Sequence, residues 1–274
     1  MTMKRTIALA VCALIAAAPS FGWGRQGHAS VARIAENHLT KTTRKALDEY
    51  LHGESIVEYA SYADDYKSQL FMEGKRGFAH TYYVDENNQP FHYVTTPEGK
   101  PINNCVYVID EFAKDLQANA KDMPDSLRWL KIVLIVHFVG DMHCPEHVRY
   151  PADNTIGYYN VIFRGEELRY HTFWDDQALS VKYPWSFSDV AYLFDRLPQK
   201  QIDEIVKGTP YDWGKDNADN CWYIHEVEPG TTLTADFLNE SKLLAKSQIQ
   251  KAGYRLAHLL NKTFDPKYAR KHRD

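Results

Sequence analysis

Apolar and polar residues alternate along most of this chain with the period of a helix. Apolar positions recur every three or four residues, the pattern of helices that bury one face. The stretch "SLRWLKIVLIVHFVGDMH" is apolar on every side, which predicts a helix at the centre of the fold. Thr40 precedes one amphipathic stretch as a helix cap. The predicted helices cover residues 27–39, 40–51, 55–70, 105–119, 126–143, 173–183, 187–197, 198–208 and 234–264.

Two segments carry β-branched and aromatic residues instead. Residues 78–96 are split by the polar turn "DENNQP", which predicts a short hairpin or an extended loop. Residues 158–171 predict two short strands around the turn "RGEE". No repeat, low-complexity stretch or linker interrupts the pattern. We therefore expect residues 23–274 to form one mainly α domain with a small β-hairpin element.

The first 22 residues have the pattern of a secretory signal peptide. Lys4 and Arg5 precede an apolar run from Ile7 to Ala18, and Ser20 and Gly22 are the small residues of a cleavage site before Trp23. The run is short for a membrane span, although a retained anchor is the alternative. The prediction is a secreted or periplasmic protein without a membrane anchor after cleavage.

The net charge of the processed chain argues against a broad basic surface that would bind duplex DNA. Removing the signal peptide leaves 30 basic and 36 acidic residues, a formal charge of −6. Such a chain is not expected to carry a broad basic surface for duplex DNA. If it handles phosphate, the positive charge must be local.

Three cysteines remain in the processed chain, since Cys12 leaves with the signal peptide. Export permits a disulfide, and an odd count leaves at least one thiol free. We expect Cys105 to pair with Cys221, leaving Cys144 free, although the sequence does not dictate this connectivity.

The stretch "VHFVGDMHCPEH" concentrates residues that bind metals. His137 and Asp141 are four positions apart and share one helix face. Burying them in an apolar helix is costly unless they pair or bind a cation. His147 follows just beyond Pro145. His171 and Asp175 repeat the four-residue spacing, so the chain carries two candidate half-sites for zinc. One such pair alone would more simply be a hydrogen bond in a core.

The new N-terminus adds donors. A free amine at Trp23 has a pKa near 8 and, with the Trp23 carbonyl, can chelate a cation. His28 lies five residues on, and Gly24 and Gly27 let the chain curl back. The simpler alternative places His28 on the surface of the first helix.

The order of these motifs resembles a known family. "WGRQGH", "YADDYK", "PFHYV", "HFVGDMHCPEH", "YHTFWD" and "KAGYRLAHLLN" run as in the three-zinc, single-strand-specific nucleases, a family of fungal extracellular and plant bifunctional enzymes. Those proteins share a helical fold with zinc phospholipase C. The resemblance spans most of the processed chain.

The resemblance implies three zinc sites. Asp64, His92, His137 and Asp141 would hold the first ion. His147, His171 and Asp175 would hold the second. Trp23, His28 and Asp141 would hold the third, with Asp141 bridging to the first. Three cations against three carboxylates would supply the local positive charge that an acidic protein needs to bind phosphate.

Several positions depart from the family pattern or admit an alternative. His80 competes with His92 as the ligand, and we expect His92 because its neighbours match the family better. Lys67 stands where relatives carry Arg, and Cys144 where they carry Gln. The usual "Gly-Gly-Asn" reads Thr-Ile-Gly at residues 155–157.

The activity implied is hydrolysis of single-stranded DNA and RNA to 5′-phosphorylated products, with 3′-nucleotidase activity as an additional option. Asp64 would orient the attacking water, Lys67 would neutralise the transition state, and Tyr93 would stack on a base, with Tyr82 or Tyr83 as alternatives. The enzyme is expected to act as a monomer. The competing functions are a zinc phospholipase C and a non-catalytic zinc-binding protein.

Overall fold

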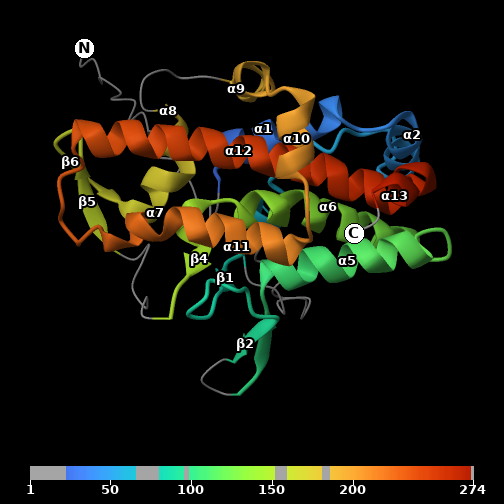
Figure 1. The fold of residues 1–274 in the computed structure, drawn as a ribbon, viewed down its shortest axis with the longest axis horizontal. Helices are drawn as coiled ribbons and strands as arrows, with labels where there is room; N and C mark the ends of the chain where they lie inside the picture. The colour runs from blue at the N-terminus through green and yellow to red at the C-terminus, as the bar shows by residue number, and fades with distance from the viewer. Residues whose placement is uncertain (1–22, 66–79, 96–98, 152–158, 181–185, 273–274) are drawn as a thin grey trace, which may run out of the picture.

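The longest helix, α12, runs along the molecule, and α1, α2, α5, α6, α8, α9, α10 and α13 all contact it (Figure 1). This computed structural model describes residues 23–65, 80–95, 99–151, 159–180 and 186–272. The helices are α1 Arg25–Asn37, α2 Lys41–Tyr50, α3 Tyr62–Asp65, α5 Cys105–Asn119, α6 Asp125–Met142, α7 Tyr170–Thr172, α8 Ala178–Ser180, α9 Phe187–Phe194, α10 Gln199–Ile205, α11 Pro210–Cys221, α12 Ala235–Phe264 and α13 Pro266–Lys271. The mainly α fold is confirmed.

The core forms where α1, α5 and α6 pack beside α12. A Cβ added at Gly253 of α12 would lie 2.5 Å from Ile34 Cγ2, so glycine permits the close approach of α1. Thr40 caps α2 as expected, because its side chain accepts a hydrogen bond from Thr43 N at 3.1 Å. In the same way, Thr234 caps α12 through Phe237 N.

Helix α6 is the central helix that the apolar run predicts. Every residue from 132 to 142 is buried. Its polar members His137 and Asp141 therefore lie in the interior, where they need partners. The C-terminal half of α6 thus positions chemistry-bearing side chains inside the core.

The strands are short and form three two-stranded pairs. Strand β1 (Tyr82–Tyr83) runs parallel to β4 (Val148–Arg149), β2 (Tyr93–Thr95) is antiparallel to β3 (Pro101–Asn103), and β5 (Asn160–Phe163) is antiparallel to β6 (Glu166–Arg169). The β5–β6 hairpin turns at Arg164 and Gly165, which both have positive φ, as a tight two-residue turn requires. Among the described residues 80–95, the two halves of this segment share one isolated β-bridge, Val84 to Pro90, because their strands β1 and β2 pair with β4 and β3.

One helix was missed, and two helical predictions need correction. Helix α11 was not predicted, since its apolar face is carried by scattered residues among Asp, Asn and Gly. Residues 173–177 form a π-helical turn, η2, between α7 and α8 rather than the start of one regular helix. Within the segment 55–70, the described residues are helical only in α3. π-turns often occur at functional sites, because the extra residue re-aims neighbouring side chains.

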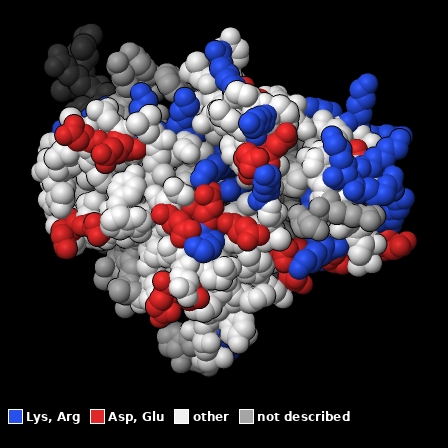
Figure 2. Space-filling view, in the orientation of Figure 1, with Lys and Arg blue, Asp and Glu red and all other residues white. Residues whose placement is uncertain are grey.

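Lys and Arg side chains gather over the end of the molecule where α2 and α13 lie (Figures 1 and 2). The exposed members are Lys41, Arg44, Lys45, Lys267, Arg270 and Lys271. Net charge alone does not reveal this local clustering. Among the described helices, none is both long and apolar enough to cross a membrane.

Candidate metal centre

Four side chains from three segments meet at the C-terminal half of α6. His137 and Asp141 lie one turn apart on α6, Asp64 comes from α3, and His80 precedes β1. His80 Nδ1 lies 2.8 Å from Asp141 Oδ2 and 3.8 Å from Asp64 Oδ1. His137 Nε2 lies 3.1 Å from Asp141 Oδ2 and 3.9 Å from Asp64 Oδ1. These nitrogen and oxygen donors converge closely enough to hold one divalent cation.

Asp141 presents its two carboxylate oxygens to different histidines. Oδ2 faces His80 and His137, while Oδ1 lies 3.5 Å from His28 Nε2 and 3.5 Å from His147 Nδ1. The side chain is fully buried between these four rings. A carboxylate in this position can bridge two cations.

His28 reaches the centre from α1. Its ring stacks on that of His137, with centroids 4.1 Å apart and an angle of 13° between the planes. Gly140 makes room for this ring, since a Cβ there would lie 2.6 Å from His28 Nδ1. The expectation that His28 belongs to a cation site, rather than the surface of the first helix, agrees with its burial beside Asp141.

A second group of donors surrounds the turn η1 (Pro145–His147). His171 Nε2 lies 3.3 Å from Asp175 Oδ2, and the rings of His147 and His171 are nearly parallel with centroids 5.6 Å apart. Cys144 and Glu146 join this group. Sequence reasoning missed Glu146, although its place between Pro145 and His147 in the motif was the available signal.

Hydrogen bonds from one ring nitrogen orient the histidines. His137 Nδ1 donates to the Ala60 carbonyl at 2.8 Å, and His147 Nδ1 donates to the His80 carbonyl at 3.1 Å. Each ring therefore keeps the lone pair on Nε2 for another partner. Histidine ligands of metals are held in this way, by an acceptor on the nitrogen that does not bind the ion.

The first residues of the "WGRQGH" motif lie beside the second group of donors, which includes Asp175. Gly24 N donates to the Asp175 carbonyl at 3.0 Å, and a Cβ on Gly24 would lie 2.2 Å from Asp176 Oδ1. Trp23 itself is fully buried. Residue 23 is thereby anchored against the π-turn that carries Asp175.

The polar atoms of the centre fit cations of high charge. Several are buried without a hydrogen-bond partner in the described part of the chain: Asp64 Oδ1, Asp141 Oδ1, Asp175 Oδ1, His28 Nε2 and His147 Nε2. The carboxylates of Asp64, Asp141 and Asp175 each lie beside histidines. Among the described residues, no Lys or Arg forms an ion pair with any of them. Buried atoms of this kind are costly unless an ion supplies the missing partner.

Burial and neighbouring charges both shift the pKa values of the histidines and of Asp175 in this centre. Burial lowers the pKa of His28 and holds that of His147 well below its usual range. Burial also lowers the pKa of His137, but the Asp141 carboxylate outweighs it and raises the value to about 9. Burial, reinforced by Glu146, raises the pKa of Asp175 well above its usual range. A bound cation would relieve the crowding of carboxylates that raises the last value.

The expectation for His92 is corrected by these contacts. His80 lies beside Asp64, His137 and Asp141. The exposed His92 instead shares a hydrogen bond between its Nδ1 and the Tyr211 hydroxyl, 2.9 Å apart. The sequence match around His92 reflects local aromatic neighbours, but the chain folds back onto α6 at residue 80.

The remaining predicted residues have varied positions. Tyr93 lies on β2 and is 57% exposed, so its ring is available for stacking, and Tyr83 is 38% exposed. Tyr82 is buried and donates to the Gly214 carbonyl, which excludes it as a stacking surface. Lys67 and the segment 155–157 lie outside the described residues, as does the signal peptide.

The expected disulfide is wrong. Cys105, Cys144 and Cys221 are all free thiols and all buried. Cys105 begins α5 and Cys221 ends α11, where its Sγ donates to Asn217 Oδ1 at 3.1 Å. Burial raises the pKa of each thiol.

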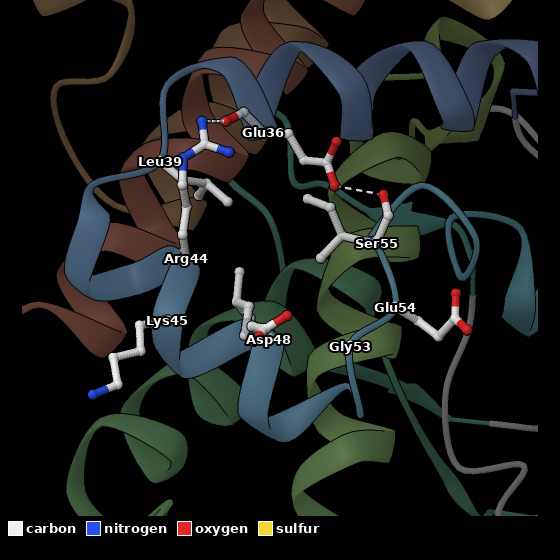
Figure 3. Close-up of a pocket in the computed structure, with 10 residues that line it drawn as sticks. Glu36, Leu39, Arg44, Lys45, Asp48, Gly53, Glu54 and Ser55 are labelled. Carbon is white, nitrogen blue, oxygen red and sulfur yellow. Dashed lines mark hydrogen bonds between the residues drawn. The ribbon is translucent and has the colours of Figure 1, made fainter.

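The cavity drawn in Figure 3 is separate from this centre. It has a volume of about 480 Å³ and is lined by residues of α1, α2 and the segment 53–56. Glu36 accepts a hydrogen bond from Ser55 across it, and Arg44 bonds the Glu36 carbonyl (Figure 3). Acidic and basic side chains both line it, so its charge selects no particular ligand.

Comparison with known proteins decides the family. The sequence model of the family described as S1/P1 Nuclease matches residues 23–265. This chain belongs to the S1/P1 nuclease family. The match begins at Trp23, the residue expected to follow the signal peptide, and includes every donor described above.

Relatives of the S1/P1 nuclease family cover nearly the whole chain. Endonuclease 2 of Arabidopsis thaliana is 21% identical over 92% of this chain and 94% of its own length. Nuclease S1 of Aspergillus oryzae is 23% identical, with coverage of 94% and 98%. Nuclease P1 of Penicillium citrinum is 26% identical, with coverage of 87% and 97%.

Proposed function

We propose that this S1/P1 family member is a secreted or periplasmic zinc-dependent endonuclease that hydrolyses single-stranded DNA and RNA to 5′-phosphorylated products. The observation that carries the proposal is the buried Asp141 carboxylate, whose two oxygens face separate sets of histidines. A nuclease that uses adjacent cations needs such a bridging carboxylate. The names of the relatives, all nucleases or endonucleases, support the same reaction class.

The donor groups divide into three proposed zinc sites. Asp64, His80, His137 and Asp141 would hold the first ion, with His80 replacing His92. His147, His171 and Asp175 would hold the second. The amine and carbonyl of Trp23, together with His28 and Asp141, would hold the third once cleavage frees that amine. When bound, zinc lowers the pKa of water toward neutrality and withdraws charge from phosphoryl oxygens.

The residues around these sites divide the remaining work. Asp64 Oδ1, buried and without a hydrogen-bond partner among the described residues, can accept a proton from the attacking water and so orient its lone pair toward phosphorus. Lys67 follows three positions later and would offset negative charge on the phosphoryl oxygens as a point charge. The apolar packing around α6 keeps bulk water from the buried side of the centre.

Preference for single strands would come from access and stacking. The metal-binding side chains lie inside the core, so the scissile phosphate must come close to them. A nucleotide whose base is paired in a duplex is hindered from making that approach. The exposed rings of Tyr93 and Tyr83 offer π-faces on which unpaired bases can stack. We propose Tyr93 as the substrate-binding residue.

The test uses the processed chain beginning at Trp23. Metal content is measured beside cleavage of single-stranded DNA, duplex DNA and phosphatidylcholine vesicles, the last arm testing a phospholipase. We expect bound zinc, preferential cleavage of the single strand and 5′-phosphate ends. Asp141→Asn should lose zinc and activity, whereas Asp219→Asn, a change on the exposed face of α11, should lose neither.

Three results would refute the proposal. They are cleavage of the lipid rather than the nucleic acid, full zinc occupancy without turnover on any of these substrates, and an Asp141→Asn variant that keeps both zinc and activity. A chain with one extra residue ahead of Trp23 tests the third site separately, because its terminal amine is displaced.

A further inference from the structure

Glu146 is a fully buried carboxylate that no part of the proposed zinc assignment uses. It lies in η1 between Pro145 and His147, and its side chain is 0% exposed. Its Oε2 accepts a hydrogen bond from His171 Nδ1. Its Oε1 has no hydrogen-bond partner among the described residues.

No basic side chain in the described part of the chain neutralises this carboxylate. Arg149 lies nearby, but its guanidinium donates to the Glu146 backbone carbonyl rather than to the side chain. Asp175 and Cys144 share the same pocket of donors and add no positive charge. Burying an ionised carboxylate without compensation is costly. A nearby cation, or a hydrogen bond that the carboxylate accepts, must therefore offset this cost.

The contact to His171 supplies that role. With Nδ1–H directed at Glu146, a neutral His171 ring has its lone pair on Nε2, and Nε2 lies 3.3 Å from Asp175 Oδ2. A nitrogen lone pair and a carboxylate oxygen repel at this distance unless a cation lies between them. The parallel ring of His147 presents its own Nε2 in the same pocket.

We propose that Glu146 is a positioning residue for the second zinc site, which it serves by fixing the tautomer and direction of His171 and by adding one negative charge beside the ion. This inference rests on the proposed function, in which His147, His171 and Asp175 hold zinc. Carboxylate partners of this kind make a histidine ligand more basic, and their loss weakens metal binding about 10–100-fold.

The experiment measures the apparent zinc affinity of the processed chain by competition with a chelating dye at constant pH. Glu146→Gln keeps an acceptor for Nδ1–H but removes the charge, whereas Glu146→Leu removes both. We expect one zinc equivalent to bind more weakly in both variants, with the Leu variant losing about 10–100-fold and the Gln variant less. Glu226→Gln, an exposed change on η3 (Trp222–Glu226), should match the unchanged chain.

A double-mutant cycle separates positioning from direct ligation. If Glu146 acts through His171, the loss caused by Glu146→Leu should be smaller in a His171→Ala background, where only the contribution of the Glu146 charge remains. Equal losses in both backgrounds would overturn the inference, as would wild-type affinity in both Glu146 variants. Circular dichroism of the zinc-free chains confirms folding, and a proton–nitrogen NMR spectrum should show His171 protonated at Nδ1 in the unchanged chain.

Cleavage of single-stranded DNA by the unchanged chain is measured in parallel. Its absence, or the absence of zinc at the second site, would refute the proposed function and with it this inference. Cleavage that persists while both Glu146 variants bind zinc normally would overturn the inference alone.

Discussion

Replacing Gly140 by alanine should displace His28, a proposed zinc ligand, without changing any of the proposed ligand residues. A Cβ at this position would lie 2.6 Å from Nδ1 and 2.9 Å from Cε1 of His28. Restoring an ordinary contact of 3.4 Å requires the ring to move by about 0.8 Å, while metal–ligand distances tolerate about 0.2 Å. The His28 side chain is buried, so the surrounding core limits how far the ring can shift to recover its position.

The effect on folding should be smaller than the effect on metal content. Alanine gains about 1 kcal/mol over glycine inside a helix, and overpacking a core costs about 1–3 kcal/mol. The free energy of unfolding of the zinc-free chain should therefore fall by no more than about 2 kcal/mol. We expect the folded Gly140→Ala variant to retain one zinc equivalent fewer after dialysis and to lose most of its nuclease activity.

Gly214→Ala on α11 is the matched control. Its Cβ would meet Pro90 Cγ at 2.9 Å and Val106 Cγ2 at 3.1 Å, neither of which belongs to the metal centre. This variant should lose stability but keep its zinc. Plasma emission spectrometry of dialysed samples measures the zinc, and urea unfolding measures the stability. A Gly140→Ala variant with full zinc content and wild-type activity would refute the placement of His28 in a metal site.

Three further predictions follow from the described contacts. His80→Ala should lower zinc content and activity, whereas His92→Ala should leave zinc content unchanged; the reverse result in metal analysis would restore His92 as the ligand. Asp216→Asn should lower the free energy of unfolding by about 3 kcal/mol in urea, because Asp216 Oδ2 accepts from the buried guanidinium of Arg255 at 2.7 Å. Burial raises the pKa of Asp216, but Arg255 and Lys251 outweigh it and hold the value below its usual range. The stabilisation is therefore present above about pH 4, and the difference between variant and wild type should shrink as the pH falls below that value. Finally, a reducing agent should leave the melting temperature unchanged, since the three cysteines are free thiols; a large drop would indicate a disulfide.

Local spacing was sufficient for the parts of the centre that one helix carries. His137 and Asp141 share a face of α6 because residues four apart always do, and the apolar run around them required burial. His171 and Asp175 were predicted by the same rule, and their side chains do meet, although a π-turn rather than a regular helix connects them.

Helix spacing could not predict which metal-binding residues come from the loops. His80 and His92 both lie in the aromatic segment before α5; His80 is nearer the family's usual distance from Asp64, whereas the neighbours of His92 match the family motif better. The choice is made by long-range pairing, since β1 lies beside β4 and so draws His80 toward the turn that carries His147. The preference for His92 came from giving its matching neighbours more weight than the distance of His80 from Asp64.

The sequence by itself determined the helical class, the central apolar helix, the family and the two histidine–aspartate pairs, because each depends on residues close together in the chain. Tertiary structure alone decided that His80 joins the centre, that Glu146 is buried against His171, and that the three cysteines are buried free thiols. Those outcomes depend on the packing of distant segments, whose burial and distances are properties of the assembled core rather than of any local pattern.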